Sequence, residues 1–158
     1  MTSEKVKYGL ENRELKLSFW EKVQHYGIVG FCFIMPATLT FMHLKDYFEN
    51  SPKPIKSGET WFLIIPTLLG ILFFYLQKNR LKFKEVNTNL NKSQLKKIID
   101  KVAEELEWHI YISNSKAIVA KTHPGFSSGS WGEQITILFD NKKVLVNSVC
   151  DLDKKSSL

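Results

Sequence analysis

Arginine is almost missing from this chain, although the chain is basic. Lys and Arg number 22 against 16 Asp and Glu, which gives a formal net charge of +6, yet Arg13 and Arg80 are the only arginines among the 158 residues. Proteins that read nucleic-acid sequence use the planar guanidinium group, which pairs with guanine edges and phosphate oxygens through two hydrogen bonds. We therefore expect no nucleic-acid partner. The lysine bias itself is typical of AT-rich bacterial genomes.

Cysteine is scarce, and the patterns that bind metals are missing. Cys32 lies in a long apolar segment and Cys150 follows a candidate strand, so we expect no disulfide between them. No cysteine or histidine spacing matches a zinc site. We assign no catalytic residue, no metal and no cofactor, and the sequence favours a protein without enzymatic activity. The histidines are interpreted as structural or surface residues: His25, His43, His109 and His123.

Charge is missing from two long segments, residues 23–44 and 60–77, which contain no Asp, Glu, Lys or Arg. As helices, the runs Tyr26–Leu44 and Thr60–Leu76 would measure roughly 28 Å and 25 Å, close to the hydrocarbon thickness of a membrane. The alternative is a pair of buried helices in a soluble core, but the rest of the chain is too small to cover two helices that are apolar on every face. We predict a transmembrane helical hairpin with spans at about 24–44 and 60–77.

Proline and glycine occur inside both spans. Pro36 and Pro66 would be costly in soluble helices, but membrane helices tolerate proline because neighbouring groups satisfy the freed carbonyls. Gly27, Gly30 and Gly70 would permit close helix contact. Both features are consistent with a helical hairpin in a bilayer.

The excess positive charge is concentrated after the second span. Residues 1–25 hold five Lys and Arg, the connecting loop 45–59 holds three, and residues 77–97 hold seven. Because cytoplasmic flanks are enriched in Lys and Arg, we expect the hairpin 23–77 to lie in the inner (plasma) membrane, with both termini cytoplasmic and the loop outside. An alternative interpretation of the basic residues after the second span is that they bind anionic lipid headgroups. The residues of this basic flank are Lys78, Arg80, Lys82 and Lys84.

The N-terminal segment 1–22 is polar and is expected in the cytoplasm. Its amphipathic stretch Glu14–Lys22 carries Leu15, Leu17 and Trp20. Such a stretch either lies along the inner membrane surface as an interfacial helix or forms the first turns of a longer first span.

A small α+β domain is predicted for residues 78–150, followed by a flexible tail at 151–158. Its helix begins after Asn91, which makes a capping box with Gln94. Apolar residues then recur at helical spacing and form one stripe. This stripe predicts a helix that packs on a sheet.

Four strand candidates follow this helix. Polar turns at Asn114-Ser115 and Asn141-Lys142 join them as two hairpins, so we expect one helix packed on an antiparallel sheet of four or five strands. The fifth strand depends on residues 80–87, which alternate as a strand would but also continue the second span as a helix. The four candidates are residues 108–113, 116–122, 133–140 and 143–150.

A segment rich in Gly and Ser, residues 123–132, separates the two hairpins. Successive backbone amides in such loops bind anions, but the segment lacks the Lys-Ser/Thr ending of a phosphate-binding loop. It is either a plain connection or a contact for a partner or ligand. The residues that would make this contact are His123, Ser127, Ser128, Ser130 and Trp131.

These patterns favour a non-enzymatic binding or regulatory module that is anchored in the inner membrane, or an accessory subunit of a membrane complex. Its expected partners are the lipid bilayer and either a membrane protein or a second copy of the chain. The alternative is a protein that binds or modifies anionic lipid, using the basic flank and the 123–132 loop.

Overall fold

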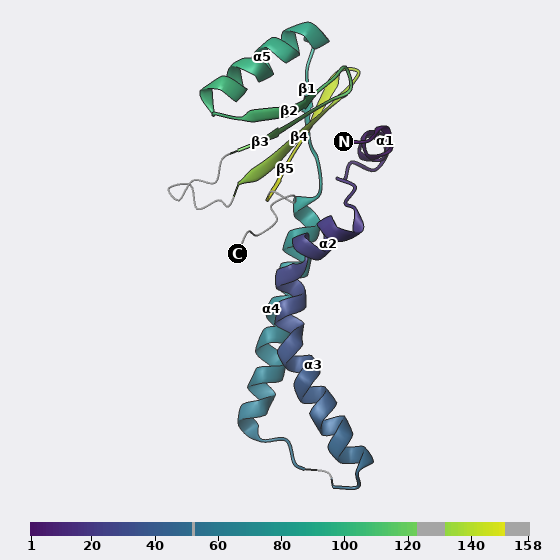
Figure 1. Ribbon diagram of the computed structural model, residues 1–158, viewed down its shortest axis with the longest axis vertical. Coiled ribbons are helices and arrows are strands. Elements are labelled where there is room, and N and C mark those ends of the chain that lie inside the picture. The colour runs from purple at the N-terminus through teal and green to yellow at the C-terminus, as the bar shows by residue number, and fades with distance from the viewer. Residues whose placement is uncertain (52, 123–131, 151–158) are drawn as a thin grey trace. The chain divides into compact units, whose positions relative to one another are not determined.

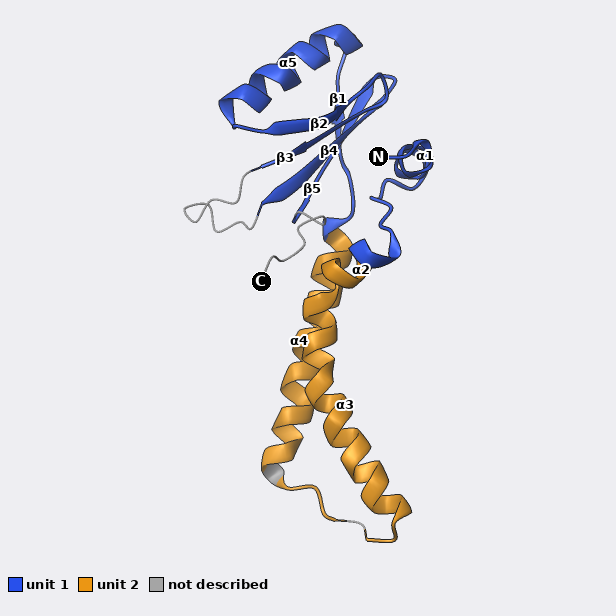
Figure 2. Cartoon of the chain, viewed as in Figure 1, with its two compact units in different colours: residues 1–21, 80–158 blue, residues 22–79 orange. Residues whose placement is uncertain are grey.

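The computed structural model describes residues 1–51, 53–122 and 132–150, and the chain forms two compact units. One unit combines Met1–Glu21 with Arg80–Leu158, and the other is Lys22–Asn79 (Figure 2). The first unit therefore draws on chain from both sides of the second. The contacts expected of His123, Ser127, Ser128, Ser130 and Trp131, and the tail 151–158, lie outside the described residues.

The second unit is a helical hairpin. After the short helix α2 (Phe19–His25), helices α3 (Gly27–Phe48) and α4 (Ser57–Arg80) run side by side in opposite directions (Figure 1). Both are long and apolar enough to cross a membrane, and only 11% of the apolar stretch of α3 and 6% of that of α4 is buried. The two apolar helices predicted from the sequence are thus present.

Both helices extend beyond the uncharged segments, so the connection is shorter than the loop predicted at 45–59. It covers only residues 49–56. Polar side chains support the additional turns. Lys45 pairs with Glu49 one turn away at 3.7 Å, and Glu59 accepts a hydrogen bond of 3.0 Å from the Lys56 amide before the first turn of α4.

A glycine sets the closest approach of the two long helices. A Cβ atom at Gly70 would lie 2.7 Å from Cε2 of Phe33, so only glycine fits there without movement of the ring. Gly27 and Gly30 have no neighbouring atom within 4 Å of such a Cβ. Close helix contact is therefore confirmed at Gly70, whereas Gly27 and Gly30 leave open space beside their backbone within the described residues of this chain.

The first unit contains the predicted antiparallel sheet, with five strands in the order β1-β5-β4-β3-β2. Helix α5 (Lys92–Glu105) covers one face of this sheet (Figure 1). The predicted capping box is confirmed, because the Asn91 side chain accepts from the Gln94 amide at 2.9 Å and the Gln94 side chain accepts from the Asn91 amide at 3.0 Å. The strands are β1 (Lys84–Asn87), β2 (His109–Ser113), β3 (Ala117–Lys121), β4 (Glu133–Asp140) and β5 (Lys143–Cys150).

Both alternatives for residues 80–87 are correct in part. Helix α4 continues to Arg80, and β1 begins at Lys84 and pairs with β5. Between them the backbone is tied to the N-terminal chain, because the Leu15 amide donates to the Leu81 carbonyl and the Phe83 amide donates to the Arg13 carbonyl, both at 2.8 Å. These two hydrogen bonds favour the extended conformation once the helix has ended.

The N-terminal segment forms a third layer that the sequence analysis did not foresee. Helix α1 (Ser3–Asn12) and the extended residues 13–17 cover the face of the sheet opposite α5. Leu15 and Leu17, each only 6% exposed, pack in one cluster with Leu138 and Leu145 of the sheet. We call the whole segment Met1–Glu21 the N-terminal layer.

The stretch Glu14–Lys22 is therefore not one surface helix. Its first half is extended. There Leu15 and Leu17 are buried against the apolar face of the sheet that α5 does not cover, because this removes apolar surface from water. Only its second half is helical, and there Phe19 and Trp20 remain 72% and 73% exposed. The expectation of a continuous interfacial helix is wrong for the part before Phe19.

An ion-pair network fastens the N-terminal layer to the edge of the sheet. Arg13, at the end of α1, reaches Glu85 of β1 at 3.2 Å and Asp140 of β4 at 2.9 Å. Lys143 of β5 reaches the second oxygen of Glu85 at 2.7 Å. The hydrogen bond from Lys143 is the largest cause of a lowered pKa of Glu85. Desolvation and the nearby Asp140 oppose the shift, but the positive charges of Lys143 and Arg13 add to the effect of the hydrogen bond, so the pKa lies below its ordinary value.

The packing of α1 on the sheet can be tested at Gly9. A Cβ atom there would lie 2.7 Å from Cδ1 of Leu138 and 3.2 Å from Cε2 of Phe83. We expect Gly9→Val to destabilise the first unit by about 1–3 kcal/mol, because a well-packed core has no room for the added methyl groups. The measurement is amide hydrogen exchange of β4 in the full-length protein, followed by mass spectrometry.

The matched control is Lys7→Val, which places the same side chain on the exposed face of α1. Exchange in β4 should be much faster for Gly9→Val than for Lys7→Val. Equal rates in the two variants would contradict the close packing of α1 on Leu138.

Candidate functional site

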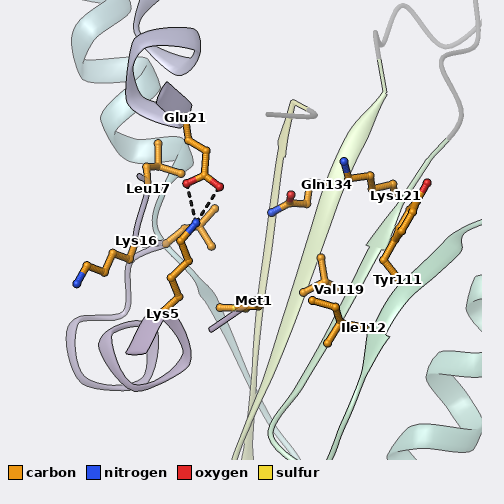
Figure 3. A pocket seen from close by; sticks show the side chains of 11 residues that line it. Met1, Lys5, Lys16, Leu17, Glu21, Tyr111, Ile112, Val119, Lys121 and Gln134 are labelled. Carbon is orange, nitrogen blue, oxygen red and sulfur yellow. Dashed lines mark hydrogen bonds and ion pairs between the residues drawn. The ribbon is translucent and has the colours of Figure 1, made fainter. Parts of the chain in front are cut away.

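A cavity of about 250 Å³ lies between the N-terminal layer and strands β2, β3 and β4. Figure 3 shows it from close by, with side chains converging from both sides. All of the lining belongs to the first unit, although it comes from both ends of the chain. The N-terminal layer contributes Met1, Lys5, Leu15, Lys16, Leu17 and Glu21, and the strands contribute Tyr111, Ile112, Val119, Lys121 and Gln134.

One wall of the cavity holds a close ion pair. Nζ of Lys5 donates to both carboxylate oxygens of Glu21, at 2.8 Å and 2.7 Å, and the two side chains are only 26% and 18% exposed. The Ser18 amide also donates to this carboxylate. Burial raises the pKa of Glu21, but the hydrogen bonds from Lys5 and Ser18 and the charge of Lys5 outweigh it, so the pKa lies below its ordinary value.

The opposite wall is shaped by a bulge in β2. Ile110 pairs with Ala120 but Ile112 pairs with Val119, so Tyr111 is an extra residue without a partner position on β3. The Tyr111 ring lies against the side chain of Lys121, whose Nζ is 5.5 Å from the ring centroid. The bulge thereby places an aromatic ring and an ammonium group together at the rim.

Each wall of the cavity combines polar and apolar side chains. In Figure 3 the Lys5–Glu21 pair lies beside Leu17 on one wall, and Gln134 and Lys121 lie above Val119 and Ile112 on the other. The lining therefore joins charged groups with apolar surface, as in many small-molecule sites. The apolar members are Met1, Leu15, Leu17, Ile112 and Val119.

The lining carries a net positive charge. Three lysines stand against one glutamate, a difference of +2. Figure 3 shows the end of the Lys16 side chain pointing away from the strands. Nζ of Lys16 pairs with Glu4 and lies 5.5 Å from the centroid of the Tyr8 ring. Lys5, Glu21 and Lys121 are the remaining charged residues of the lining, and Lys5 is paired with Glu21.

The structure does not bring the predicted basic residues into this cavity. Lys78, Arg80, Lys82 and Lys84 are all exposed. The backbone around two of them is held in place, because the Asn147 side chain donates to the carbonyls of Arg80 and Lys82 at 2.8 Å and 3.0 Å. These hydrogen bonds involve only the backbone of Arg80 and Lys82, and the four basic side chains are exposed to solvent.

Comparison of the chain with protein-family models, with curated proteins and with solved structures gives no match. In the part of the chain that the structure describes, no group of three or more His, Cys, Asp or Glu side chains is arranged to hold a metal ion.

The pairing of Lys5 with Glu21 predicts a pH-dependent contribution to stability. Because the pKa of Glu21 is lowered in the folded protein, the contribution is fully present above the ordinary glutamate pKa of about 4.3 and is lost as the pH falls through the lower folded value. At pH 7, Glu21→Gln should destabilise the first unit by about 1–2 kcal/mol, since the pair is partly buried and hydrogen-bonded.

The measurement is denaturant unfolding of the full-length protein in detergent at a series of pH values. The difference between the wild type and Glu21→Gln should vanish at the acid end of the series. Glu4→Gln is the control, because Glu4 also pairs with a lysine but is 77% exposed, so its loss should matter little. A difference that grows as the pH falls would contradict the assigned role of the carboxylate.

Proposed function

We propose that this protein is a binding module anchored in the inner membrane, with α3 and α4 crossing the bilayer and the α+β unit on the cytoplasmic side. The observation that carries the proposal is the interleaved core. Residues before the hairpin (Leu15, Leu17) and after it (Leu138, Leu145) pack in one cluster. Both flanks must therefore lie on the same side of any membrane that the hairpin enters, and two crossings satisfy this requirement.

The exposed side chains of the hairpin support its insertion into a bilayer. Large apolar residues such as Phe31, Phe41 and Leu68 are 61–74% exposed on α3 and α4. Leaving such surface in water costs about 25 cal/mol per Å², and contiguous patches of this kind are rare on soluble proteins. An apolar solvent or an apolar partner would remove this cost.

The distribution of charge supports the orientation. Five Lys and Arg precede the hairpin and seven follow it within residues 77–97, whereas three lie between the expected spans. Flanks rich in Lys and Arg remain in the cytoplasm. Residues 49–56 would then face the outside, together with the ends of α3 and α4.

Binding fits the cavity better than catalysis does. Its lining offers ammonium groups, one carboxylate, a phenol and an amide beside apolar side chains, a set that recognises a ligand by charge and shape. The described lining holds no Ser, Cys or His that a neighbouring base would activate as a nucleophile. This arrangement suits the binding of a ligand or a partner protein. The hairpin would then serve as the membrane anchor or as the contact with a membrane complex.

Thiol labelling with a membrane-impermeant maleimide tests the topology. With Cys32→Ala as background, Cys150 is exposed and should react only after the cells are permeabilised. In a cysteine-free background, Ser3→Cys should behave in the same way as Cys150, and Ser51→Cys should react in intact cells.

Different results for Ser3→Cys and Cys150 would contradict the shared core of the two flanks. Reaction of both in intact cells, with protection of Ser51→Cys, would reverse the orientation but leave the hairpin in place. Recovery of the protein in the soluble fraction after gentle lysis would contradict membrane insertion altogether.

The exposed basic flank favours a second candidate, the binding of anionic lipid. Lys78 and Arg80 occupy the last turn of α4, where a cytoplasmic end would meet lipid headgroups. The combined change Lys78→Gln and Arg80→Gln should reduce the phosphatidylglycerol that copurifies with the full-length protein in mild detergent. The same change at Lys96 and Lys97 on the exposed side of α5 is the control and should leave lipid retention unaltered.

A further inference from the structure

A second cavity of the first unit lies on the face of the sheet that α5 covers. It measures about 300 Å³, and its lining comes from the first turns of α5, the turn between β2 and β3, and the end of β4 (Figure 1). Its apolar members, Ile118 and Phe139, pack in the cluster beneath α5. The cavity shares no residue with the one beside Lys5 and Glu21, and we call it the α5 cavity. Its polar members are Lys92, Ser93, Lys96, Asn114 and Ser115.

The described lining of the α5 cavity contains no acidic residue. The ammonium groups of Lys92 and Lys96 make neither a hydrogen bond nor an ion pair within the described chain. The same is true of Lys116, which lines an adjoining groove of about 760 Å³ that continues toward α1. The α5 cavity and this groove share Lys92, Asn114, Ser115 and Phe139.

The acidic residues of the adjoining groove do not compensate these lysines, because each of them already has a basic partner elsewhere. Three unpaired ammonium groups therefore give this end of the α+β unit a local excess of positive charge. The existing pairs are Glu4 with Lys16, Glu11 with Lys7 and Asp140 with Arg13.

Two of the unpaired lysines act against the stability of their own helix. Lys92 and Lys96 are one turn apart on α5, and like charges at this spacing destabilise a helix. The first turn of α5 also has no acidic residue that would offset them, although acidic side chains stabilise this end of a helix. Sequences break such local rules mainly at functional sites. A bound anion would supply the missing negative charge.

A neutral hydrogen-bond donor accompanies the lysines. Oδ1 of Asn114 accepts hydrogen bonds from the amides of Lys116 at 2.9 Å and Ala117 at 2.8 Å, which fixes the side chain in the turn. Its Nδ2 makes no hydrogen bond with the described chain and remains able to donate to a ligand.

We propose that the α5 cavity binds a phosphate monoester that carries a small apolar group. The phosphate lies among Nζ of Lys92, Lys96 and Lys116 and accepts a hydrogen bond from Nδ2 of Asn114, and the apolar group lies against Phe139. This site is additional to the cavity beside the N-terminal layer. It does not depend on the insertion of the hairpin into a membrane.

The number of lysines favours a doubly charged ligand. A phosphate monoester carries a charge of about −1.5 to −2 at pH 7 and has three strong acceptor oxygens, which match three ammonium groups. The phosphodiester of phosphatidylglycerol has a single negative charge and matches them less well. A cavity of about 300 Å³ lies at the lower end of the range of about 300–1,000 Å³ for small-molecule sites, so a phosphate with one ring fits.

The experiment is isothermal titration calorimetry on the full-length chain in phosphatidylcholine nanodiscs. One probe is phenyl phosphate. The other is methyl phenyl phosphate, a diester that differs by one methyl group and has only one negative charge. Phenyl phosphate should bind saturably, and the diester should bind at least about fivefold more weakly.

Substitutions of single lysines locate the site. Lys96→Gln should weaken binding of phenyl phosphate by about threefold to tenfold, whereas Lys96→Arg, which keeps the charge, should retain binding. Lys97→Gln is the matched control on the same helix and should have no effect, because Lys97 does not line the cavity. Removing Lys96 relieves its repulsion with Lys92, so weaker binding by Lys96→Gln would not come from a less stable helix.

Three results would overturn the proposal. They are equal affinities for the monoester and the diester, equal losses in Lys96→Gln and Lys97→Gln, and no binding of phenyl phosphate up to about 10 mM.

A further titration identifies the source of the phosphate. Phosphatidic acid is a lipid with a phosphate monoester, and nanodiscs that contain it are compared with nanodiscs that hold the same negative charge as phosphatidylglycerol. Weaker apparent binding of phenyl phosphate with phosphatidic acid alone supports the site and makes a lipid its ligand. Equal binding in the two kinds of nanodisc supports the site with a soluble ligand.

Discussion

The packing of one sheet by chain from both sides of the hairpin is the constraint on which the rest of this structure depends. Leu138 and Leu145 are fully buried, and helix α5 covers only the opposite face, so these side chains need the N-terminal layer. This requirement places Leu15 and Leu17 in the core and creates the cavity beside Lys5 and Glu21. It also restricts the hairpin to paths that return the chain to the side from which it started.

The elements that follow from local pattern could be predicted from the sequence. Capping residues, alternation of apolar side chains and long uncharged runs act over a few residues, and they identified α5, the four longer strands and the two apolar helices. The ends of α3 and α4 were placed less well, because the polar interactions of Lys45 and Glu59 continue the helices beyond the apolar runs. Such extensions depend on interactions between polar groups, which a hydropathy pattern does not predict.

The N-terminal layer and the cavity depend on contacts between residues more than a hundred positions apart, which no local pattern specifies. One signal was present: β5 carries apolar residues on both faces, with Val144 and Val146 on one side and Leu145 and Val149 on the other. A strand that is apolar on both faces needs two covering layers. The bulge that places Tyr111 at the rim of the cavity follows from the pairing of β2 with β3. The alternating pattern of residues 108–113 did not predict this bulge.

The interleaved core also sets an order of events during synthesis. The N-terminal segment leaves the ribosome first, whereas Leu145, which packs in the same cluster as Leu15, is made 130 residues later (145 − 15). At about 5–20 residues per second, Leu15 waits for roughly 6–26 s while the hairpin and the sheet are synthesised. Throughout that interval Val6, Leu15 and Leu17 lack the sheet residues that bury them in the folded chain.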